Sequence, residues 1–159
     1  MLLVDDERGL RKGLAAFLRL GGHEVVEAGS VREGLAAAEA APPDVLISDY
    51  RMDDGTGLDL ARALLRTLPE TKVILLTGYA EGEALAARDG DGPADRVLEK
   101  PARPRAIREV VESLLEGAAK ARPGGDVPGA GGSLPWRGTS SARERREERR
   151  LLWGEREES

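Results

Sequence analysis

The chain has 159 residues and a formal net charge of −5, with one histidine and no cysteine. This length suits one domain of ordinary size and leaves a remainder too short for a second. The composition excludes a disulfide scaffold and a thiolate metal site, and the acidic balance does not favour direct binding of nucleic acid.

Short apolar runs and helical patterns alternate from the first residues onward. Residues 2–4 form an apolar run that predicts a strand. Apolar side chains then recur at i, i+4, i+7 and i+8, as on one face of a helix. These are Leu10, Leu14, Phe17 and Leu18. A second strand is expected at 25–26, and Ser30 with Glu33 has the form of a capping box that opens a second helix through Ala40.

The alternation continues through three more strands and helices. Residues 44–48 have the pattern of a buried strand, and a loop leads to a third helix. The apolar face of that helix consists of Leu58, Ala61, Leu64, Leu65 and Leu68. Further strands are expected at 73–76 and 96–99, with a weak Ala-rich helix at 80–89 between them. The fifth helix presents Ile107, Val110, Val111, Leu114 and Leu115.

These elements predict an α/β fold, a doubly wound five-stranded parallel sheet in the flavodoxin-like order 2-1-3-4-5 with helices on both faces. The apolar periodicity ends near Gly117, so we expect one domain at 1–116 and a flexible tail at 117–159. The tail is first Gly/Pro-rich and then Arg/Glu-rich. No apolar run approaches the about 20 residues that cross a bilayer, and a cytoplasmic location is expected.

Polar side chains follow four of the predicted strands. Asp5 and Asp6 follow the first strand, Asp49 the third, Thr77 the fourth and Lys100 the fifth. The carboxyl ends of parallel strands share one edge of a sheet, so these residues should converge in one site. Three carboxylates repel one another unless a cation is present, and Mg²⁺ is expected because it prefers oxygen ligands. A hydroxyl and an ammonium complete a cradle for a phosphoryl group.

Four motifs at these strand ends carry a family resemblance. They are Val4-Asp5-Asp6-Glu7, Ser48-Asp49-Tyr50-Arg51-Met52, Leu76-Thr77-Gly78-Tyr79 and Glu99-Lys100-Pro101. Together they resemble the receiver domains of two-component response regulators, in particular a stand-alone receiver like the chemotaxis regulators. The resemblance covers about residues 1–116. It implies a phosphoacceptor of a two-component phosphorelay, which is a signalling phosphoprotein and not an enzyme in the usual sense.

The resemblance also implies a role for each residue of the site. Asp49 would be the phosphoacceptor and a Mg²⁺ ligand, Asp6 a direct ligand, and Asp5 the holder of a metal-bound water. The main-chain carbonyl of Arg51 would be a further ligand. Thr77 would hydrogen-bond a phosphoryl oxygen.

Lys100 would pair first with the acceptor and then with the phosphate, and the Lys100–Pro101 bond resembles one that is cis in the family. The phosphoryl group would come from a histidine of a sensor histidine kinase or phosphotransfer protein, and a downstream protein target would receive the signal. No contact with a membrane or directly with nucleic acid is expected. The oligomeric state stays open, with a homodimer as one option.

Two positions depart from the family pattern. Asp53 stands where a proline commonly follows the Met of the acceptor loop, and Val97 stands where a Tyr or Phe usually reports phosphorylation. Two others, Arg51 and Tyr79, occupy the positions that flank the phosphoryl group in the family, and both are large enough to restrict an attacking water. The lone His23 is expected at the surface near a strand edge.

Three other functions use related folds or sites. A phosphorylation-independent adaptor would use the receiver fold only as a docking surface, and the departures at Asp53 and Val97 leave this alternative open. A Mg²⁺-dependent phosphatase with an aspartyl nucleophile would resemble Asp-x-Asp after the first strand, whereas Asp5 and Asp6 are adjacent here. A DNA-binding regulator would need an output unit, and the tail lacks the room and apolar content for a helix-turn-helix.

Overall fold

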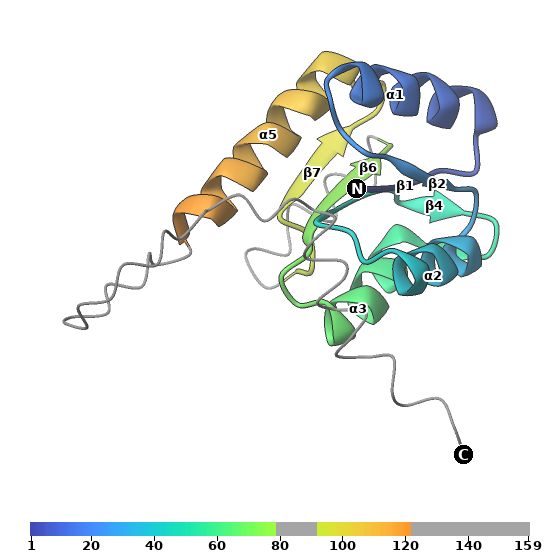
Figure 1. Cartoon of the computed structure of the whole chain (residues 1–159). Coiled ribbons are helices and arrows are strands. Elements are labelled where there is room, and N and C mark those ends of the chain that lie inside the picture. The colour runs from blue at the N-terminus through green and yellow to red at the C-terminus, as the bar shows by residue number, and fades with distance from the viewer. Residues whose placement is uncertain (79–91, 122–159) are drawn as a thin grey trace, which may run out of the picture. The chain divides into compact units, whose positions relative to one another are not determined.

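The computed structural model describes residues 1–78 and 92–121 (Figure 1). The elements, in chain order, are β1 (Leu2–Val4), α1 (Arg8–Leu20), β2 (Val26–Ala28), α2 (Val31–Ala40), β3 (Val45–Asp49), β4 (Arg51–Met52), β5 (Gly55–Thr56), α3 (Gly57–Thr67), β6 (Lys72–Thr77), β7 (Arg96–Glu99) and α5 (Pro104–Ala121). The weak helix expected at 80–89 lies outside the described residues. Among the described helices, none is long and apolar enough to cross a membrane.

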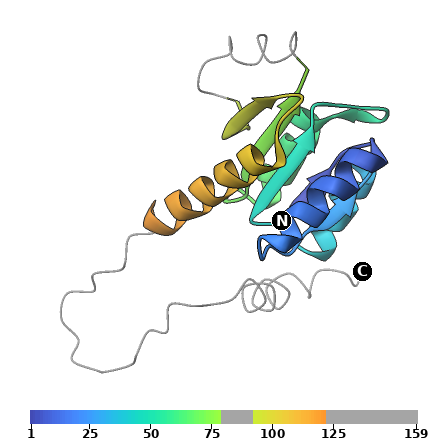
Figure 2. The same cartoon turned by 90° about the horizontal axis from the view of Figure 1, so that it is seen from above.

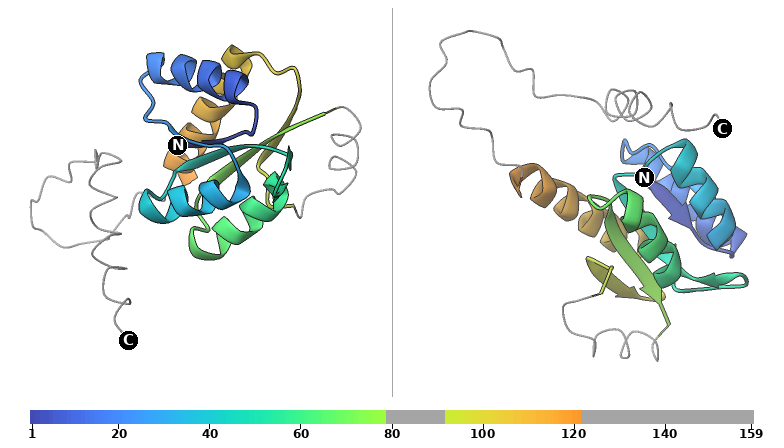
Figure 3. Two further views of the ribbon diagram at one scale, coloured as in Figure 1. Left: turned by 90° about the vertical axis from the view of Figure 1, so that its right-hand side faces the viewer. Right: turned by 90° about the horizontal axis from the view of Figure 1, so that it is seen from below.

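Five strands form one parallel sheet in the order β2-β1-β3-β6-β7. Counted along the five predicted strands, this is the order 2-1-3-4-5, and the predicted fold class is confirmed. Figure 1 shows α1 and α5 on one face of the sheet and α2 and α3 on the other. The views from above and from the side agree on this arrangement, with α1 beside α5 (Figures 2 and 3).

Each face of the sheet has its own core cluster, because successive strand residues point to opposite faces. The strand residues packed against α2 and α3 are Leu2, Val4, Ala28, Leu46, Val73 and Leu75. Those packed against α1 and α5 are Leu3, Val45, Ile47, Ile74 and Leu76. Burial of one such aliphatic side chain contributes about 1.5–3 kcal/mol. The central strands are therefore held from both sides, as the continuous apolar runs predicted.

Side-chain caps set where two of the helices begin. Ser30 Oγ accepts the Glu33 N–H at 3.1 Å, and Glu33 Oε2 accepts the Gly29 N–H at 2.7 Å. This is the predicted capping box, with the return bond reaching one residue further back than usual. At α3, Thr56 Oγ1 accepts the Asp59 N–H at 3.1 Å, so the helix begins at once after β5.

Two side chains differ in exposure from what the sequence pattern indicated. Leu10 is 52% exposed, because it lies in the first turn of α1 and borders an open cavity. The side chain of His23 is only 18% exposed, and its Nε2 lies 3.9 Å from Glu112 of α5. The placement of His23 depends on α5, which packs beside α1 and also sets the Arg108 guanidinium over the Phe17 ring.

Helix α5 continues through Gly117, where the domain boundary was expected, to Ala121. The residues after Gly117 are Ala118, Ala119 and Lys120, which are good helix formers. The division of the chain into a domain at 1–116 and a tail at 117–159 stays a prediction.

A chain that ends at Ala121 should keep the cooperative melting transition of the full-length protein, because it retains both core clusters as they occur in the described residues. Far-ultraviolet circular dichroism of the two lengths should give Tm values within about 3 °C of each other. Loss of the transition in the shorter chain would mean that residues 122–159 contribute to the core.

Candidate functional site

The order of the sheet brings five polar residues from four strand ends to one edge. Asp5 and Asp6 come directly after β1, Asp49 is the last residue of β3, Thr77 is the last of β6, and Lys100 comes directly after β7. These strands are consecutive neighbours in the sheet and run parallel. The predicted convergence of the strand ends is therefore present.

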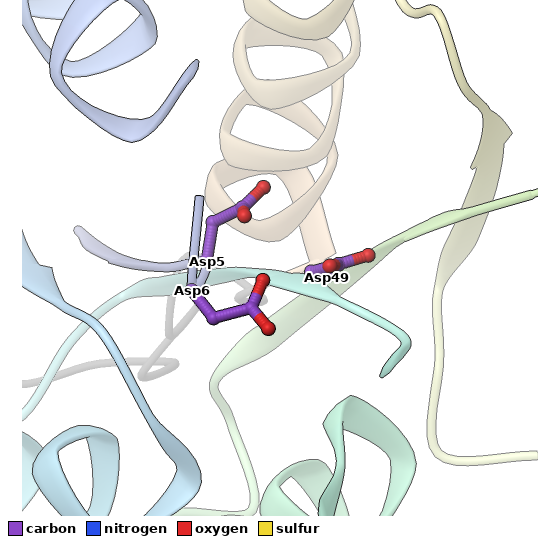
Figure 4. A group of neighbouring side chains, drawn as sticks. All are labelled: Asp5, Asp6 and Asp49. Atoms are coloured by element: carbon purple, nitrogen blue, oxygen red, sulfur yellow. The ribbon is translucent and has the colours of Figure 1, made fainter. Parts of the chain in front are cut away.

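Three carboxylates lie next to one another at this edge (Figure 4). One ligand oxygen from each of Asp5, Asp6 and Asp49 lies within 4.8 Å of the others. Asp5 is buried, Asp49 is partly buried and Asp6 is exposed. A hard cation with oxygen ligands fits this set, and Mg²⁺ in particular keeps several waters, for which the exposed side at Asp6 leaves access.

Lys100 joins two of these carboxylates. Its Nζ lies 3.1 Å from Asp49 Oδ1 and 3.2 Å from Asp5 Oδ2. The Lys100 N–H donates to the Thr77 carbonyl at 2.7 Å, which fixes the backbone from which the side chain extends. The Lys100–Pro101 bond is cis, as the resemblance implied.

The charges of the site do not balance. Burial raises the pKa of the Asp49 carboxyl; the hydrogen bond and charge of Lys100 oppose this, and the charges of Asp5 and Asp6 add to it. For Lys100, burial lowers the pKa, but the hydrogen bonds and charges of Asp49 and Asp5 outweigh it and raise the pKa. One ammonium thus faces three carboxylates, and the excess negative charge is what a divalent cation would neutralise.

Thr77 carries a hydroxyl that is buried and has no hydrogen-bond partner within residues 1–78 and 92–121. A buried hydroxyl without a partner costs about 1–3 kcal/mol. In the sheet register Asp49 lies opposite Leu76, so Thr77 is one position beyond the acidic residue on the neighbouring strand. The hydroxyl is available to an oxygen that arrives at Asp49.

The backbone on either side of Asp49 is tightly held. Tyr50 donates its N–H to the Leu76 carbonyl and accepts the Gly57 N–H, both at 2.8 Å. A Cβ at Gly57 would overlap the Asp49 carbonyl oxygen and lie 2.7 Å from Ser48 Oγ. Only glycine therefore lets α3 begin so close to the end of β3.

The segment after Asp49 is not the plain loop that the sequence suggested. β4 and β5 form a short antiparallel hairpin, with Arg51 opposite Thr56 and Met52 opposite Gly55. Two residues per strand are too few for an alternating pattern to show in the sequence. Met52 is buried and Arg51 is exposed, and the role expected for the Arg51 main-chain carbonyl stays a prediction. Tyr79 lies outside the described residues.

Sequence reasoning missed Arg11, a residue of α1 that contacts the backbone of Asp5 at the end of β1. One guanidinium nitrogen of Arg11 donates to the Asp5 carbonyl at 2.6 Å, and its Nε lies 3.6 Å from Glu27 Oε2 on β2. The Asp5 carboxylate also accepts the Glu7 N–H at 2.8 Å. A cavity of about 310 Å³ adjoins these groups, and its lining consists of Asp5, Leu10, Arg11, Leu14, Leu76, Lys100, Pro101, Ala102 and Ile107. No sequence signal separates Arg11 from the other charged residues of α1.

Replacing Asp49 by Asn should raise the Tm of the metal-free protein at neutral pH. The folded-state pKa of Asp49 lies above its ordinary value of 3.8, so keeping this carboxyl ionised in the folded state costs free energy. Melting curves should be measured in chelator at several pH values. At pH values above the raised pKa, the Tm of Asp49→Asn should exceed that of the wild type by a few degrees. The gain should vanish below the ordinary pKa, where both states of the wild-type carboxyl are protonated. A lower Tm for Asp49→Asn at neutral pH would mean that the ion pair with Lys100 outweighs burial and repulsion.

Residues 1–112 match the family described as the response regulator receiver domain. The photosynthetic apparatus regulatory protein RegA of Cereibacter sphaeroides is 34% identical over 136 residues, which cover 86% of this chain and 72% of that protein. The DNA-binding transcriptional activator DevR/DosR of Mycobacterium tuberculosis is 42% identical over 87 residues, which cover 54% of this chain and 40% of that protein.

Solved structures agree with the sequence relatives. A CheY-like receiver domain protein from Methanospirillum hungatei superposes with a TM-score of 0.67 at 30% identity, over 76% of this chain and 95% of that chain. The chemotaxis protein CheY4 of Vibrio cholerae gives a TM-score of 0.61 at 30% identity, over 71% and 95% of the two chains. The family match spans the whole sheet and all four of its strand-end motifs. The family match, the order of the sheet and the acidic strand ends agree, and the chain therefore belongs to the family of response regulator receiver domains.

Proposed function

We propose that this receiver accepts a phosphoryl group on Asp49 from a histidine of a partner kinase or phosphotransfer protein. The observation that carries the proposal is the contact of Lys100 Nζ with both Asp49 and Asp5, at 3.1 and 3.2 Å. With Asp6, these residues would provide a nucleophile, a cation site and a phosphate-binding ammonium at one edge of the sheet. These are the parts that phosphoryl transfer requires.

The proposed metal ligands are the carboxylates of Asp6 and Asp49 and the main-chain carbonyl of Arg51, with Asp5 holding a metal-bound water. The donor set fits Mg²⁺, because its oxygens are hard ligands and one side of the cluster is open to water. Bound there, Mg²⁺ would neutralise negative charge where the phosphoryl oxygens meet the carboxylates.

The chain's own residues supply the nucleophile and hold it in position. A carboxylate oxygen of Asp49 forms the new O–P bond while the P–N bond to the donor imidazole breaks, and the imidazole nitrogen keeps that electron pair. Lys100 passes from the carboxylate to a phosphoryl oxygen, and the unpaired hydroxyl of Thr77 donates to the same group. Water later hydrolyses the acyl phosphate, so turnover is slow self-dephosphorylation rather than an enzymatic cycle.

The step that follows phosphorylation is assigned only as far as the class of partner. RegA is named as a regulatory protein and DevR/DosR as DNA-binding, but the aligned region spans only 40% of DevR/DosR. We therefore assign the receiver step to this chain and infer a cytoplasmic kinase partner and a downstream protein target. Direct contact of the receiver with nucleic acid is not part of the proposal.

A phosphorylation-independent adaptor is the alternative that one observation favours. Val97 on β7 is a small side chain, 37% exposed, so it cannot act as a rotating aromatic reporter of phosphorylation. The orphan hydroxyl of Thr77 and the position of Lys100 favour phosphorylation instead, because a docking surface needs neither.

Incubation with Mg²⁺ and acetyl phosphate should add one phosphoryl group to the wild-type protein, with a linkage more stable in acid than in base. Asp49→Asn should remove the label because the nucleophile is gone, and intact-mass spectrometry reads the result directly. Asp53→Asn is the matched control, since it removes an exposed carboxylate nearby and should be labelled as the wild type. Unchanged labelling of Asp49→Asn would place the acceptor elsewhere.

The lifetime of the phosphorylated form should shorten when Arg51 and Tyr79 are both replaced by alanine. By the family resemblance these side chains flank the phosphoryl group, where they restrict the approach of water. Decay after donor removal should be about tenfold faster, equivalent to roughly 1.4 kcal/mol of barrier. Arg62→Ala, an exposed change on α3, serves as the control. Equal or slower decay in the double variant would rule out shielding.

A further inference from the structure

Asp54 lies between β4 and β5 and binds the first turn of α2. Its Oδ1 accepts the Val31 N–H at 2.9 Å and its Oδ2 accepts the Arg32 N–H at 3.0 Å. The first N–H groups of a helix have no partner inside that helix. A carboxylate from the acceptor hairpin thus supplies the partners that α2 lacks, and it links two parts of the chain that are distant in sequence.

The contact also places the negative charge of Asp54 at the N-terminus of α2. Hydrogen bonds from the Arg32 and Val31 N–H groups lower the pKa of the Asp54 carboxyl, so the group is ionised at neutral pH. An anion is favourable at the positive end of the helix dipole. Ser30 already caps the Glu33 N–H, so Asp54 adds to an existing cap and does not replace it.

The hairpin has few contacts of its own to keep it in place. It consists of two residue pairs, which do not make an independently stable hairpin. Asp53 stands where proline would restrict the backbone. What holds the hairpin is tertiary: Met52 is buried in the core beside α2 and α3, and the backbone of Gly55 approaches Val31 so closely that a Cβ would lie 3.3 Å from its methyl group.

The same end of α2 adjoins the other half of the acidic site. β2 ends at Ala28, whose carbonyl accepts the Asp5 N–H at 3.1 Å. The chain then enters α2 at Val31. The N-terminus of α2 is therefore connected to Asp5 through β2 and to the segment after Asp49 through Asp54.

We propose that Asp54 is a positioning residue for the acceptor site, and the proposal rests on the function proposed above. Its carboxylate clamps the β4–β5 hairpin to α2 and so keeps the main chain of Arg51 and the acceptor Asp49 in register with Asp6. In this chain the clamp supplies the rigidity that a proline at position 53 would give. Without it, binding of a cation would first have to order the hairpin, and the apparent affinity would fall by the fraction of molecules that are ordered.

The competing interpretation is that Asp54 merely caps α2. A cap contributes about 0.5–2 kcal/mol to stability and has no effect on cation affinity once the protein is folded. Mg²⁺ affinity of the folded protein therefore separates the two interpretations, whereas Tm does not.

The test compares Asp54→Ala and Asp54→Asn with the control Asp53→Ala. The control also removes one carboxylate, from the neighbouring residue, whose side chain is exposed. Mg²⁺ dissociation constants are measured by titration calorimetry without phosphodonor, at a temperature where all variants are folded. Asp54→Ala should weaken Mg²⁺ binding about tenfold relative to Asp53→Ala. Asp54→Asn should lie between them, because its side-chain oxygen can still accept one hydrogen bond; it also decides the question if Asp54→Ala does not fold. With acetyl phosphate, the Mg²⁺ concentration for half-maximal labelling should shift by the same factor while the rate at saturating Mg²⁺ stays within about twofold.

Equal Mg²⁺ affinities in Asp54→Ala, Asp54→Asn and Asp53→Ala would overturn the positioning role and leave only a cap. Absence of Mg²⁺ binding in the wild type would overturn it too. If the wild type binds Mg²⁺ but takes no phosphoryl group, the proposed function fails, and calorimetry still decides whether Asp54 positions the cation site.

Discussion

The contact of Lys100 with Asp5 and Asp49 is the interaction on which the site depends. It joins the ends of β7, β1 and β3, which are distant in sequence and meet only because the sheet is parallel and ordered β2-β1-β3-β6-β7. The ammonium offsets part of the repulsion among three carboxylates, and the remaining negative charge, together with burial, raises the pKa of Asp49. The site is consequently a receptor for a cation and, next to it, for a phosphoryl group.

The two faces of the sheet support different halves of this site. On the face of α2 and α3, the core includes Met52 of the acceptor hairpin, and Gly57 lets α3 start against the backbone of Asp49. On the face of α1 and α5, Arg11 holds the Asp5 carbonyl, and a cavity runs from there to Lys100. Each helix layer therefore contributes contacts to one half of the site.

The hairpin after Asp49 has Asp53 where a proline commonly stands in the family, and it contacts other elements of the fold. A proline stiffens a loop locally by restricting one backbone dihedral. Here the restraint comes from contacts with other elements: buried Met52, the close approach of Gly55 to Val31, and the Asp54 carboxylate on the N–H groups of α2. Such restraints connect the acceptor hairpin to α2.

By itself the sequence determined the alternation of strands and helices, the strand-end motifs from Asp5 to Lys100 and the family, because apolar periodicity and local motifs are written in neighbouring residues. It did not reveal the roles of Arg11 and Asp54, the exposure of Leu10 or the covered position of His23. Three of these depend on a residue from another element: Arg11 on the Asp5 carbonyl, Asp54 on the N-terminus of α2, and His23 on Glu112 of α5. Only the tertiary structure decided them, because a charged side chain has the same sequence pattern whether it lies in solvent or binds a distant backbone group, and packing alone selects between the two.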